Sequence, residues 1–245
     1  MSDFIVQVNN VTKTYQMGEE QIHALRGVSL EIQRGQYVSI MGPSGSGKST
    51  LFNMIGGLDK PTTGDVLIEG YRLTELSLSQ LAWVRCHKIG FIFQSFNLIP
   101  TMTALENVAI ARIFSGVTPH QARKDAAVTL ELVGLGHRLH HLPSQVSGGQ
   151  QQRIAIARAL VNQPAIILAD EPTGNLDLHT GEEIINLIGQ MKSTLGITVI
   201  TATHDMKMLS ASDFVVWIKD GAIDRIAQKG EITIEVGTID GKTMA

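Results

Sequence analysis

The sequence is nearly without cysteine, since Cys86 is the only one among its 245 residues. A single cysteine excludes an intrachain disulfide and fits a reducing compartment. Long apolar runs are also missing, because no run approaches the roughly 20 residues that a membrane-spanning helix needs. One longer candidate, residues 97–114, is interrupted by Pro100 and Glu106. The first ten residues carry an acid at Asp3 and no apolar core, so we expect no signal peptide. Any membrane span is expected on another chain.

Positive charge is not in excess: 20 Lys and Arg residues stand against 23 Asp and Glu residues, a formal net charge of −3. Nucleic-acid binding requires a basic face to meet the phosphate backbone, so we expect no nucleic-acid partner. Apolar residues make up 43% of the chain and charged residues 18%, which is the composition of an ordinary globular protein. The length fits one large domain or two small ones.

The order of apolar segments predicts an α/β fold. Two short strands, at 4–8 and 28–32, come first and are bounded by polar turns. Strands and helices then alternate, which indicates a largely parallel sheet. The turn at Lys219, Asp220 and Gly221 favours a hairpin into a last strand. The other predicted segments are strands at 37–41, 64–70, 89–93, 165–170, 197–201 and 213–218, and helices from about 48, at 77–88 and at 178–195.

The middle third of the chain predicts only helices, over roughly residues 95–160. Thr103 and Glu106 form a capping box at the start of one helix. Thr118 precedes Pro119 at the first position of a second helix, which should stop at Gly134. The apolar face of that second helix consists of Ala122, Ala126, Leu130 and Val133.

These boundaries predict one domain over residues 1–230, with the helical subdomain at about 95–160 inserted between strands. Residues 231–245 form a short C-terminal extension. Its alternating apolar residues are compatible with an added edge strand, and no role follows from them.

Residues 42–50, GPSGSGKST, match the phosphate-loop pattern G-x-x-x-x-G-K-[ST]. The glycines let backbone N–H groups turn toward phosphate oxygens, and the following helix adds the positive end of its dipole. Lys48 is expected to reach the β and γ phosphates, and the Ser49 hydroxyl to bind Mg²⁺. Four fixed positions match by chance in roughly one per cent of such chains. The predicted nucleotide-binding residues here are Gly42, Pro43, Ser44, Gly45, Ser46, Gly47, Lys48, Ser49 and Thr50.

Two adjacent carboxylates, Asp170 and Glu171, follow the buried-looking strand 165–170. Open α/β sheets bind ligands at the carboxyl ends of their strands. Asp170 is expected in the Mg²⁺ shell, and Glu171 is expected to orient and deprotonate a water molecule. The alternative, a solvated acid at a helix start, would be favoured for Glu171 if no phosphate loop were present.

A second glycine-rich stretch, Val146 to Gln150 (VSGGQ), precedes an apolar-periodic helix expected from Gln150. It resembles the signature motif of the ATP-binding subunits of ATP-binding-cassette (ABC) transporters, in which leucine usually occupies the position of Val146. Generic phosphate-loop proteins lack this element. The resemblance extends in order over roughly residues 4–227, almost the whole chain.

Four further positions carry the resemblance. Gln94 matches the Q-loop, the stretch Asn175–Asp177 matches the D-loop, His204 matches the switch histidine, and Tyr15 matches the aromatic residue that stacks on adenine. Gln94 and His204 both follow predicted strands. Gln94 can therefore touch Mg²⁺ or water, and His204 can hydrogen-bond a γ-phosphate. Packing at a strand end is the alternative interpretation for Tyr15, and a structural role is the alternative for His204.

The resemblance implies a P-loop NTPase fold of ABC type: a mixed sheet core, an N-terminal antiparallel β subdomain and the inserted helical subdomain. It implies an ATPase in which Mg-ATP lies between the phosphate loop of one copy and the signature of a second copy. The catalytic residues would be Lys48, Gln94, Glu171 and His204, and the metal residues Ser49, Gln94 and Asp170. Further nucleotide contacts would come from Tyr15, Ser147, Gly148, Gly149, Gln150 and Asp177.

Residues 42–66, 89–108 and 168–177 are similar to the branch that includes macrolide exporters, lipoprotein-release ATPases and the cell-division ATPase. Such a branch implies an ATP-dependent homodimer at the cytoplasmic face of the bacterial inner membrane, driving a separate permease for export or extraction. The pair Cys86–His87 departs from a basic pair frequent in the branch. An ATP-switched scaffold or mechanotransducer without cargo is the alternative function. A soluble ATPase of DNA maintenance would need a longer insertion before Ser147, and a small-molecule kinase has no use for the signature.

Overall fold

The computed structural model describes residues 4–231, 234–235, 238–239 and 242–243. Its centre is a six-stranded sheet of order β10-β9-β3-β8-β7-β6. All neighbouring pairs are parallel except β9 and β10, which pair antiparallel. The turn between those two contains Asp220 and Gly221, both with positive φ, which confirms the predicted hairpin. The strands are β3 (Tyr37–Met41), β6 (Ile89–Phe93), β7 (Ile166–Asp170), β8 (Thr198–Ala202), β9 (Phe214–Lys219) and β10 (Ala222–Gln228).

The parallel strands bring several sequence motifs to one edge of this sheet. Asp170 is paired with both Phe93 and Ala202 at the strand ends, and Ile40 is also paired with Ala202. The segments that follow β3, β6, β7 and β8 therefore leave the sheet on the same side. In an open parallel sheet this carboxyl edge is the place where ligands bind.

A second sheet is antiparallel, with order β2-β1-β4-β5. The first two strands are much longer than the sequence predicts, because the pairing continues past several bulges as far as Met17 opposite Glu20. Apolar alternation in the sequence does not predict this continuation of the strands, because polar residues occupy its outer face. The strands are β1 (Phe4–Met17), β2 (Glu20–Gln33), β4 (Thr63–Ile68) and β5 (Tyr71–Arg72). Helix α1 (Lys48–Ile55) contacts both sheets.

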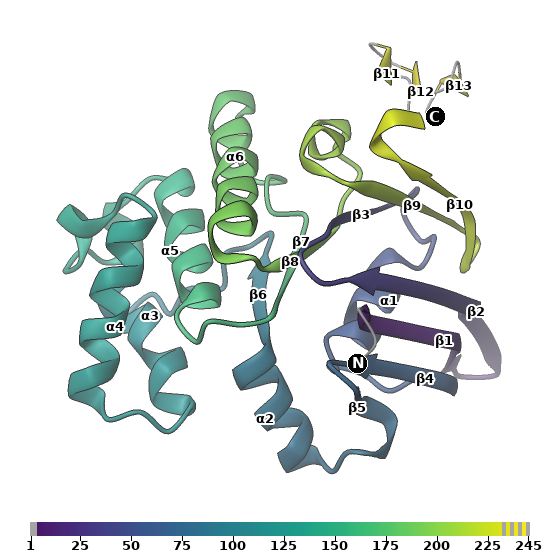
Figure 1. The fold of residues 1–245 in the computed structure, drawn as a ribbon, viewed down its shortest axis with the longest axis horizontal. Helices are drawn as coiled ribbons and strands as arrows, with labels where there is room; N and C mark the ends of the chain where they lie inside the picture. Colours follow the sequence, from purple (N-terminus) through teal and green to yellow (C-terminus); the bar gives the residue numbers. More distant parts are fainter. Residues whose placement is uncertain (1–3, 232–233, 236–237, 240–241, 244–245) are drawn as a thin grey trace.

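Three helices form the inserted block between β6 and β7: α3 (Ala104–Phe114), α4 (Pro119–Leu132) and α5 (Gly148–Leu160). Figure 1 shows them as a layer on the side of the six-stranded sheet away from the antiparallel sheet. Both predicted caps are present, because the Thr103 and Thr118 hydroxyls accept backbone N–H groups three residues on. Helix α5 begins at Gly148, two residues before the expected start at Gln150, because Ser147 caps it.

Two more helices lie outside this block, α2 (Leu78–Lys88) and α6 (Leu178–Leu195), and both match the predicted spans. The spacing of Leu78, Leu81 and Val84 predicts a common apolar face for α2, but Leu78 is 80% exposed while Leu81 and Val84 are buried. Leu78 is the first residue of the helix, so its side chain points past the helix start, where there is no preceding turn. Short 3-10 turns occur at Leu73–Glu75, Gly136–Arg138, Pro143–Gln145, Met206–Ala211 and Lys229–Glu231.

The described part of the C-terminal extension consists of β11 (Ile234–Glu235), β12 (Thr238–Ile239) and β13 (Lys242–Thr243). These strands pair with one another in a separate antiparallel sheet rather than extending the edge of the six-stranded sheet. Among the residues described here, no helix combines the length and the apolar character required to span a bilayer.

Candidate functional site

The predicted phosphate loop joins β3 to α1 at the carboxyl edge of the sheet. Gly47 has φ 106°, and a Cβ there would lie 2.6 Å from the Ala24 carbonyl oxygen, so glycine is required. No side chain caps the N-terminus of α1, which leaves its first backbone N–H groups available for an anion. The Lys48 amino group donates to the carbonyls of Gly42 at 2.6 Å and Pro43 at 3.0 Å, which folds its side chain back over the loop.

Asp170 and Glu171 lie at the end of β7. Burial raises the pKa of Asp170, the Glu171 charge raises it further, and the Lys48 ammonium opposes both effects. The two carboxylates therefore form a concentrated negative site next to the phosphate loop. Glu171 has φ 45°, a left-handed conformation that is rare outside glycine, asparagine and aspartate. Its N–H donates to the Ala202 carbonyl at 2.9 Å, which fixes this strained peptide to the neighbouring strand.

His204 contacts Glu171 directly. The distance from His204 Nδ1 to Glu171 Oε1 is 2.8 Å, and the Thr203 hydroxyl lies 3.4 Å from Oε2. The Glu171 side chain is 17% exposed and the His204 side chain 73%. Two neighbouring strands thus supply a sheltered carboxylate and an exposed imidazole that orient each other, as a general base and its partner require.

Gln94 follows β6 at the same edge and is joined to Asn175. Its backbone carbonyl accepts from Asn175 Nδ2 at 2.9 Å, and its side-chain amide lies 3.4 Å from Asn175 Oδ1. A Cβ on Gly174 would lie 2.7 Å from Gln94 Nε2, so the two loops approach closely. The predicted Q-loop and D-loop segments of the chain are therefore in contact.

Tyr15 lies toward the end of β1 and is 36% exposed. Its hydroxyl donates to Asp59 Oδ2 at 3.0 Å. The Thr50 hydroxyl at the end of the phosphate loop is also close enough to affect the phenol, lowering its pKa against the rise caused by burial and Asp59. Tyr15 is thus close to the loop while much of its ring remains accessible.

The signature stretch is built differently from the phosphate loop. The Ser147 hydroxyl accepts from the Gln150 N–H at 3.3 Å, and Gln150 Oε1 accepts from the Ser147 N–H at 3.0 Å. This reciprocal pair caps α5, whose first turn lies in the helical layer while α1 lies beside the antiparallel sheet (Figure 1). Val146 packs against the apolar core of that layer, as expected of a substitute for leucine.

Gly149 and Asp177 both lie next to Thr180 in the first turn of α6. A Cβ on Gly149 would overlap the Thr180 Cγ2 methyl, whereas a Cβ on Gly148 would make only ordinary contacts. Asp177 caps α6, because Oδ1 accepts from the Thr180 N–H at 3.0 Å and Oδ2 from the Thr180 hydroxyl at 2.7 Å. Hydrogen bonds from the Thr180 hydroxyl and N–H hold the pKa of Asp177 below its usual range. In this chain both residues therefore have a structural role that motif matching does not reveal.

The sequence interpretation missed Gln152. This side chain is fully buried on α5, and its Nε2 donates to the Pro172 carbonyl at 2.7 Å. The bond fixes the peptide that follows Glu171 to the signature helix. Its only signal in the sequence was a polar residue on the same helical face as Gly149 and Ile156.

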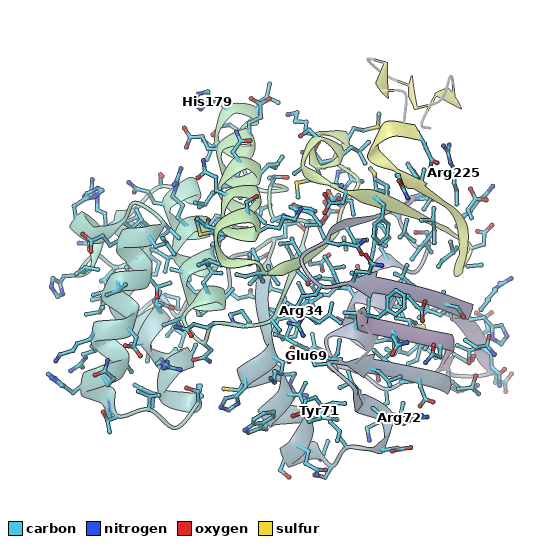
Figure 2. The ribbon with its side chains drawn as sticks, viewed as in Figure 1. Arg34, Glu69, Tyr71, Arg72, His179 and Arg225 are labelled. Carbon is cyan, nitrogen blue, oxygen red and sulfur yellow. The ribbon has the colours of Figure 1, made fainter. Side chains whose placement is uncertain are left out.

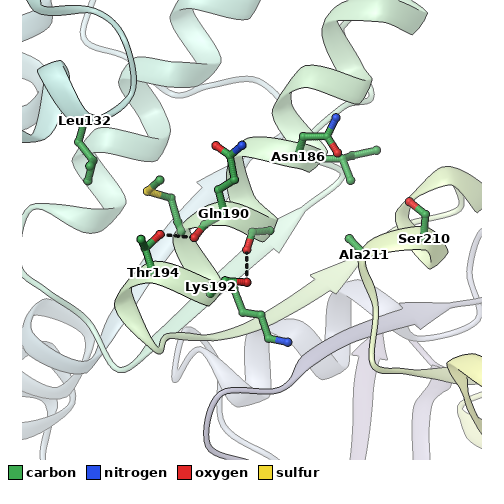
Figure 3. A pocket seen from close by; sticks show the side chains of 11 residues that line it. Leu132, Asn186, Gln190, Lys192, Thr194, Ser210 and Ala211 are labelled. Carbon is green, nitrogen blue, oxygen red and sulfur yellow. Dashed lines mark hydrogen bonds between the residues drawn. The ribbon is translucent and has the colours of Figure 1, made fainter.

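One prominent cavity is remote from all these residues. It has a volume of about 710 Å³ and is formed mainly by the C-terminal half of α6 and the 3-10 turn Met206–Ala211 (Figure 3). No residue predicted for the site lines it. The candidate site is instead the shared strand edge that carries the phosphate loop, Gln94, Asp170, Glu171 and His204, with Tyr15 beside it and residues 147–150 in another layer.

The fold and this edge define a phosphate-loop nucleotide-binding protein, and comparison with known proteins gives the family. The sequence model of the family described as "ABC transporter" matches residues 25–174. An uncharacterized ABC transporter ATP-binding protein of Thermotoga maritima is 52% identical over 93% of this chain and 97% of its own length. The chain therefore belongs to the ABC transporter family, as an ATP-binding domain with the α/β fold expected, and its enzyme class is ATPase.

Named relatives match the expected branch. The lipoprotein-releasing system ATP-binding protein LolD of a Shewanella species (strain MR-4) is 43% identical, over 94% of this chain and 100% of its own length. The macrolide export ATP-binding/permease protein MacB of Rhodopirellula baltica is 45% identical over 94% of this chain, which spans 34% of that larger protein.

A solved structure supports the same assignment. The ATP-binding cassette MJ0796 of Methanocaldococcus jannaschii, a dimer in a post-hydrolysis state bound to ADP and Pi, superposes with a TM-score of 0.84. The two sequences are 49% identical, and the match covers 91% of this chain and 98% of the other.

Proposed function

We propose that this chain hydrolyses Mg-ATP in an ATP-dependent homodimer and thereby drives a separate membrane permease. The observation that carries the proposal is the 2.8 Å contact between Glu171 and His204 at the strand edge that also carries the phosphate loop. A carboxylate fixed there has the position of a general base for water attacking a terminal phosphate.

Each residue has a distinct task in this mechanism. Lys48 and the uncapped N–H groups of α1 hold the phosphates, and Tyr15 stacks on the adenine. Glu171 accepts the proton of the attacking water. His204, with both ring nitrogens protonated, orients Glu171 by donating from Nδ1 and donates from Nε2 to the developing charge on the γ-phosphate. Positioning and electrostatic stabilisation supply most of the rate in phosphoryl transfer, so the fixed geometry of Glu171 matters more than its basicity.

The residues present fit Mg²⁺ as the metal. A carboxylate at Asp170, a hydroxyl at Ser49 and an amide oxygen at Gln94 are hard oxygen donors, which Mg²⁺ prefers over softer ligands. Burial and the adjacent Glu171 charge raise the pKa of Asp170, so a cation that stabilises its charged form is favoured there. When bound, Mg²⁺ would neutralise phosphate charge. The protein's part is to hold the oxygen donors in place.

Ser147, Gly148, Gly149, Gln150 and Asp177 are proposed to contact the ATP held by a second copy. Two features support this assignment: the capped N-terminus of α5 adds its dipole, and it lies in a different layer from α1. The relative MJ0796 is a dimer in its structure with ADP and Pi, which supports a second copy of this chain as the partner. ATP would then join two copies, and hydrolysis would release them.

A groove of about 480 Å³ lies where α2, β6, α3 and α5 meet. It is lined by apolar side chains such as Phe91 and Phe114 and by the basic residues Arg85 and Arg158. Phe93 and Asn97, which bracket Gln94, line it as well. We propose it as the permease contact, through which movement of Gln94 reaches the membrane partner. The names of the LolD and MacB relatives favour export or extraction. A place at the cytoplasmic face of the inner membrane is part of the same proposal.

The experiment that tests the catalytic assignment is Glu171→Gln. Its steady-state ATPase rate should fall at least about 100-fold, as expected on loss of general-base catalysis. The variant should form a stable dimer at saturating Mg-ATP in size-exclusion chromatography with light scattering. Glu182→Gln, an equal change at an exposed position on α6, is the control and should keep its rate. Monomeric Glu171→Gln at saturating Mg-ATP would contradict the proposal.

The permease contact has a convenient probe, because the sole cysteine, Cys86, lines the groove. In membranes containing the cognate permease, a short thiol-to-amine crosslinker should join Cys86 to that permease, and Cys86→Ser should abolish the product. Absence of the crosslinked product from Cys86 would refute this groove as the contact. Cargo that stimulates the ATPase rate of the reconstituted complex would distinguish transport from a cargo-free mechanotransducer.

A further inference from the structure

Tyr15 is held by a cluster of charged groups that no motif includes. Asp59, in the loop after α1, accepts the Tyr15 hydroxyl at 3.0 Å and pairs with Lys13 Nζ at 2.8 Å. Lys13 Nζ also donates to the Lys60 carbonyl at 2.7 Å, and the Lys60 N–H donates to Asp59 at 2.7 Å. Three of these bonds join the end of β1 to the loop that follows the phosphate-loop helix, and the Lys60–Asp59 bond lies within that loop.

The cluster leaves one face of the Tyr15 ring for a ligand. Lys13 and Tyr15 are two residues apart on β1, so their side chains project from the same side of the strand. Lys13 Nζ lies 4.8 Å from the ring centroid, over one face of the ring. An aromatic base can therefore stack only on the opposite face, and Asp59 fixes which face that is by holding both side chains.

The protonation states favour this arrangement around neutral pH. Burial opposes ionisation of Asp59, but hydrogen bonds from Lys13, the Lys60 N–H and Tyr15 together hold its pKa below the usual range. Burial and the Asp59 carboxylate raise the pKa of the Tyr15 phenol, so it keeps the proton that it donates. Asp59 thus accepts two strong donors as an anion.

We propose that Asp59 is a positioning residue for nucleotide recognition: through the Tyr15 hydroxyl and Lys13 it holds the Tyr15 ring as a one-sided platform for the adenine base. This inference depends on the proposed stacking of adenine on Tyr15. Asp59 touches neither the base nor the phosphates in this scheme. It contributes only to the part of the affinity that depends on the base.

The test compares ADP with pyrophosphate, which shares the phosphates of ADP and has no base, by isothermal titration calorimetry in the presence of Mg²⁺. Asp59→Ala should weaken ADP binding about fivefold, the effect of one net hydrogen bond, and leave pyrophosphate binding within about twofold. Asp59→Asn keeps an oxygen acceptor for the phenol and should retain most of the ADP affinity. Asp65→Ala is the control, because Asp65 lies on β4 of the same sheet but bonds Arg72 and Thr74 and not Tyr15.

A double-mutant cycle separates this role from general support of the loop. Tyr15→Phe removes only the hydroxyl, so in that background Asp59→Ala should cost clearly less ADP affinity than it does alone. Equal weakening of ADP and pyrophosphate by Asp59→Ala would refute the proposal, as would unchanged ADP binding. Should Asp59→Ala fail to fold, Tyr15→Phe decides the question by the same ratio, because it removes the hydroxyl through which Asp59 acts. If Tyr15→Ala leaves the ratio unchanged, adenine stacking itself is wrong, whereas a wild type that binds neither ligand contradicts the proposed function.

Discussion

At the residue scale, the two glycines of the signature differ in what they do. Gly149 has to lack a side chain because α5 crosses the start of α6 there, and the Thr180 methyl occupies the space of a Cβ. Gly148 has no such constraint, since a Cβ would lie 3.5 Å from Leu176 and 3.9 Å from Phe96. The sequence motif treats them alike, while packing distinguishes them.

This difference predicts opposite effects of alanine. Gly148→Ala should be neutral or stabilising, because alanine favours a helix over glycine by about 1 kcal/mol. Gly149→Ala should destabilise the chain by about 1–3 kcal/mol through overpacking against Thr180. Thr180→Ser removes the methyl group and keeps the hydroxyl that Asp177 accepts, so the double variant should regain most of the loss. Urea unfolding gives the free energy of unfolding of the four variants and of the wild type. A Gly149→Ala defect that Thr180→Ser does not relieve would show that another contact is responsible.

The residues that sequence could assign are those whose function depends on local backbone. The phosphate loop needs its glycines within one strand–turn–helix unit, and Asp170 needs only a strand end. Asp59 and Gln152 act through bonds to residues 44 and 20 positions away, and no local pattern marks such partners. The structural role of Gly149 was hidden for the same reason, because it depends on Thr180 of another helix. The cap that Asp177 provides is local, since its partner Thr180 lies three residues on. Their proposed contacts with a second copy remain predictions.

At the element scale, α5 connects the signature to residues 171–177, the proposed catalytic loop between β7 and α6 of its own chain. Besides the Gln152 bond to Pro172, Arg153 donates to the Val133 carbonyl at 3.1 Å and to Glu183 of α6 at 3.0 Å. The spans of α3, α4 and α6 could be predicted because capping residues and glycines mark their ends. The extent of β1 and β2 could not, since it depends on pairing across bulges.

Gln152→Met is expected to uncouple the signature helix α5 from the loop that follows Glu171. Methionine matches the volume of glutamine and removes both the donor to Pro172 and the Oε1 atom, which is buried without a partner among the described residues. In the proposed dimer the signature and the catalytic loop of one chain serve different ATP molecules. The variant should therefore keep its ATP affinity while kcat and the Hill coefficient for ATP both fall.

Gln151→Met provides the matched control. Gln151 donates its side-chain amide to the Pro143 carbonyl at 3.1 Å, within the segment that leads into α5, and does not contact the catalytic loop. Its kcat and Hill coefficient should stay near those of the wild type. Equal kinetics for Gln152→Met and the wild type would mean that the buried bond supports folding alone.

At the scale of the whole molecule, one carboxylate joins three parts of the fold. Glu69, just after β4, pairs with Arg34 at 2.6 Å in the turn after β2 and with Lys88 at 2.8 Å at the end of α2. Figure 2 shows Arg34 and Glu69 together between the antiparallel sheet and the strands of the larger sheet. The Glu69 side chain is only 15% exposed, so its charge depends on both partners. This triad lies away from the carboxyl edge and helps to hold the two sheets in position relative to each other.

The triad predicts a pH-dependent stability. Burial would raise the pKa of Glu69, but hydrogen bonds and charges from Lys88 and Arg34 outweigh burial and hold the pKa below its usual range. A carboxyl whose folded pKa is depressed stabilises the protein above its unfolded pKa of about 4.3, and the stabilisation disappears as pH falls through the folded value.

Glu69→Gln should therefore lower the free energy of unfolding by about 1–2 kcal/mol at pH 7, and the difference from wild type should shrink below about pH 4.5. Urea titrations at about pH 7, 5 and 3.5 measure this difference in stability, twice above the transition and once below its start. Glu75→Gln is the control, because the Glu75 side chain is 73% exposed and pairs with Arg72 at the surface. It should show little difference from the wild type at any pH. A Glu69→Gln deficit that persists undiminished at the lowest pH would mean that shape, and not charge, makes Glu69 the link between the sheets.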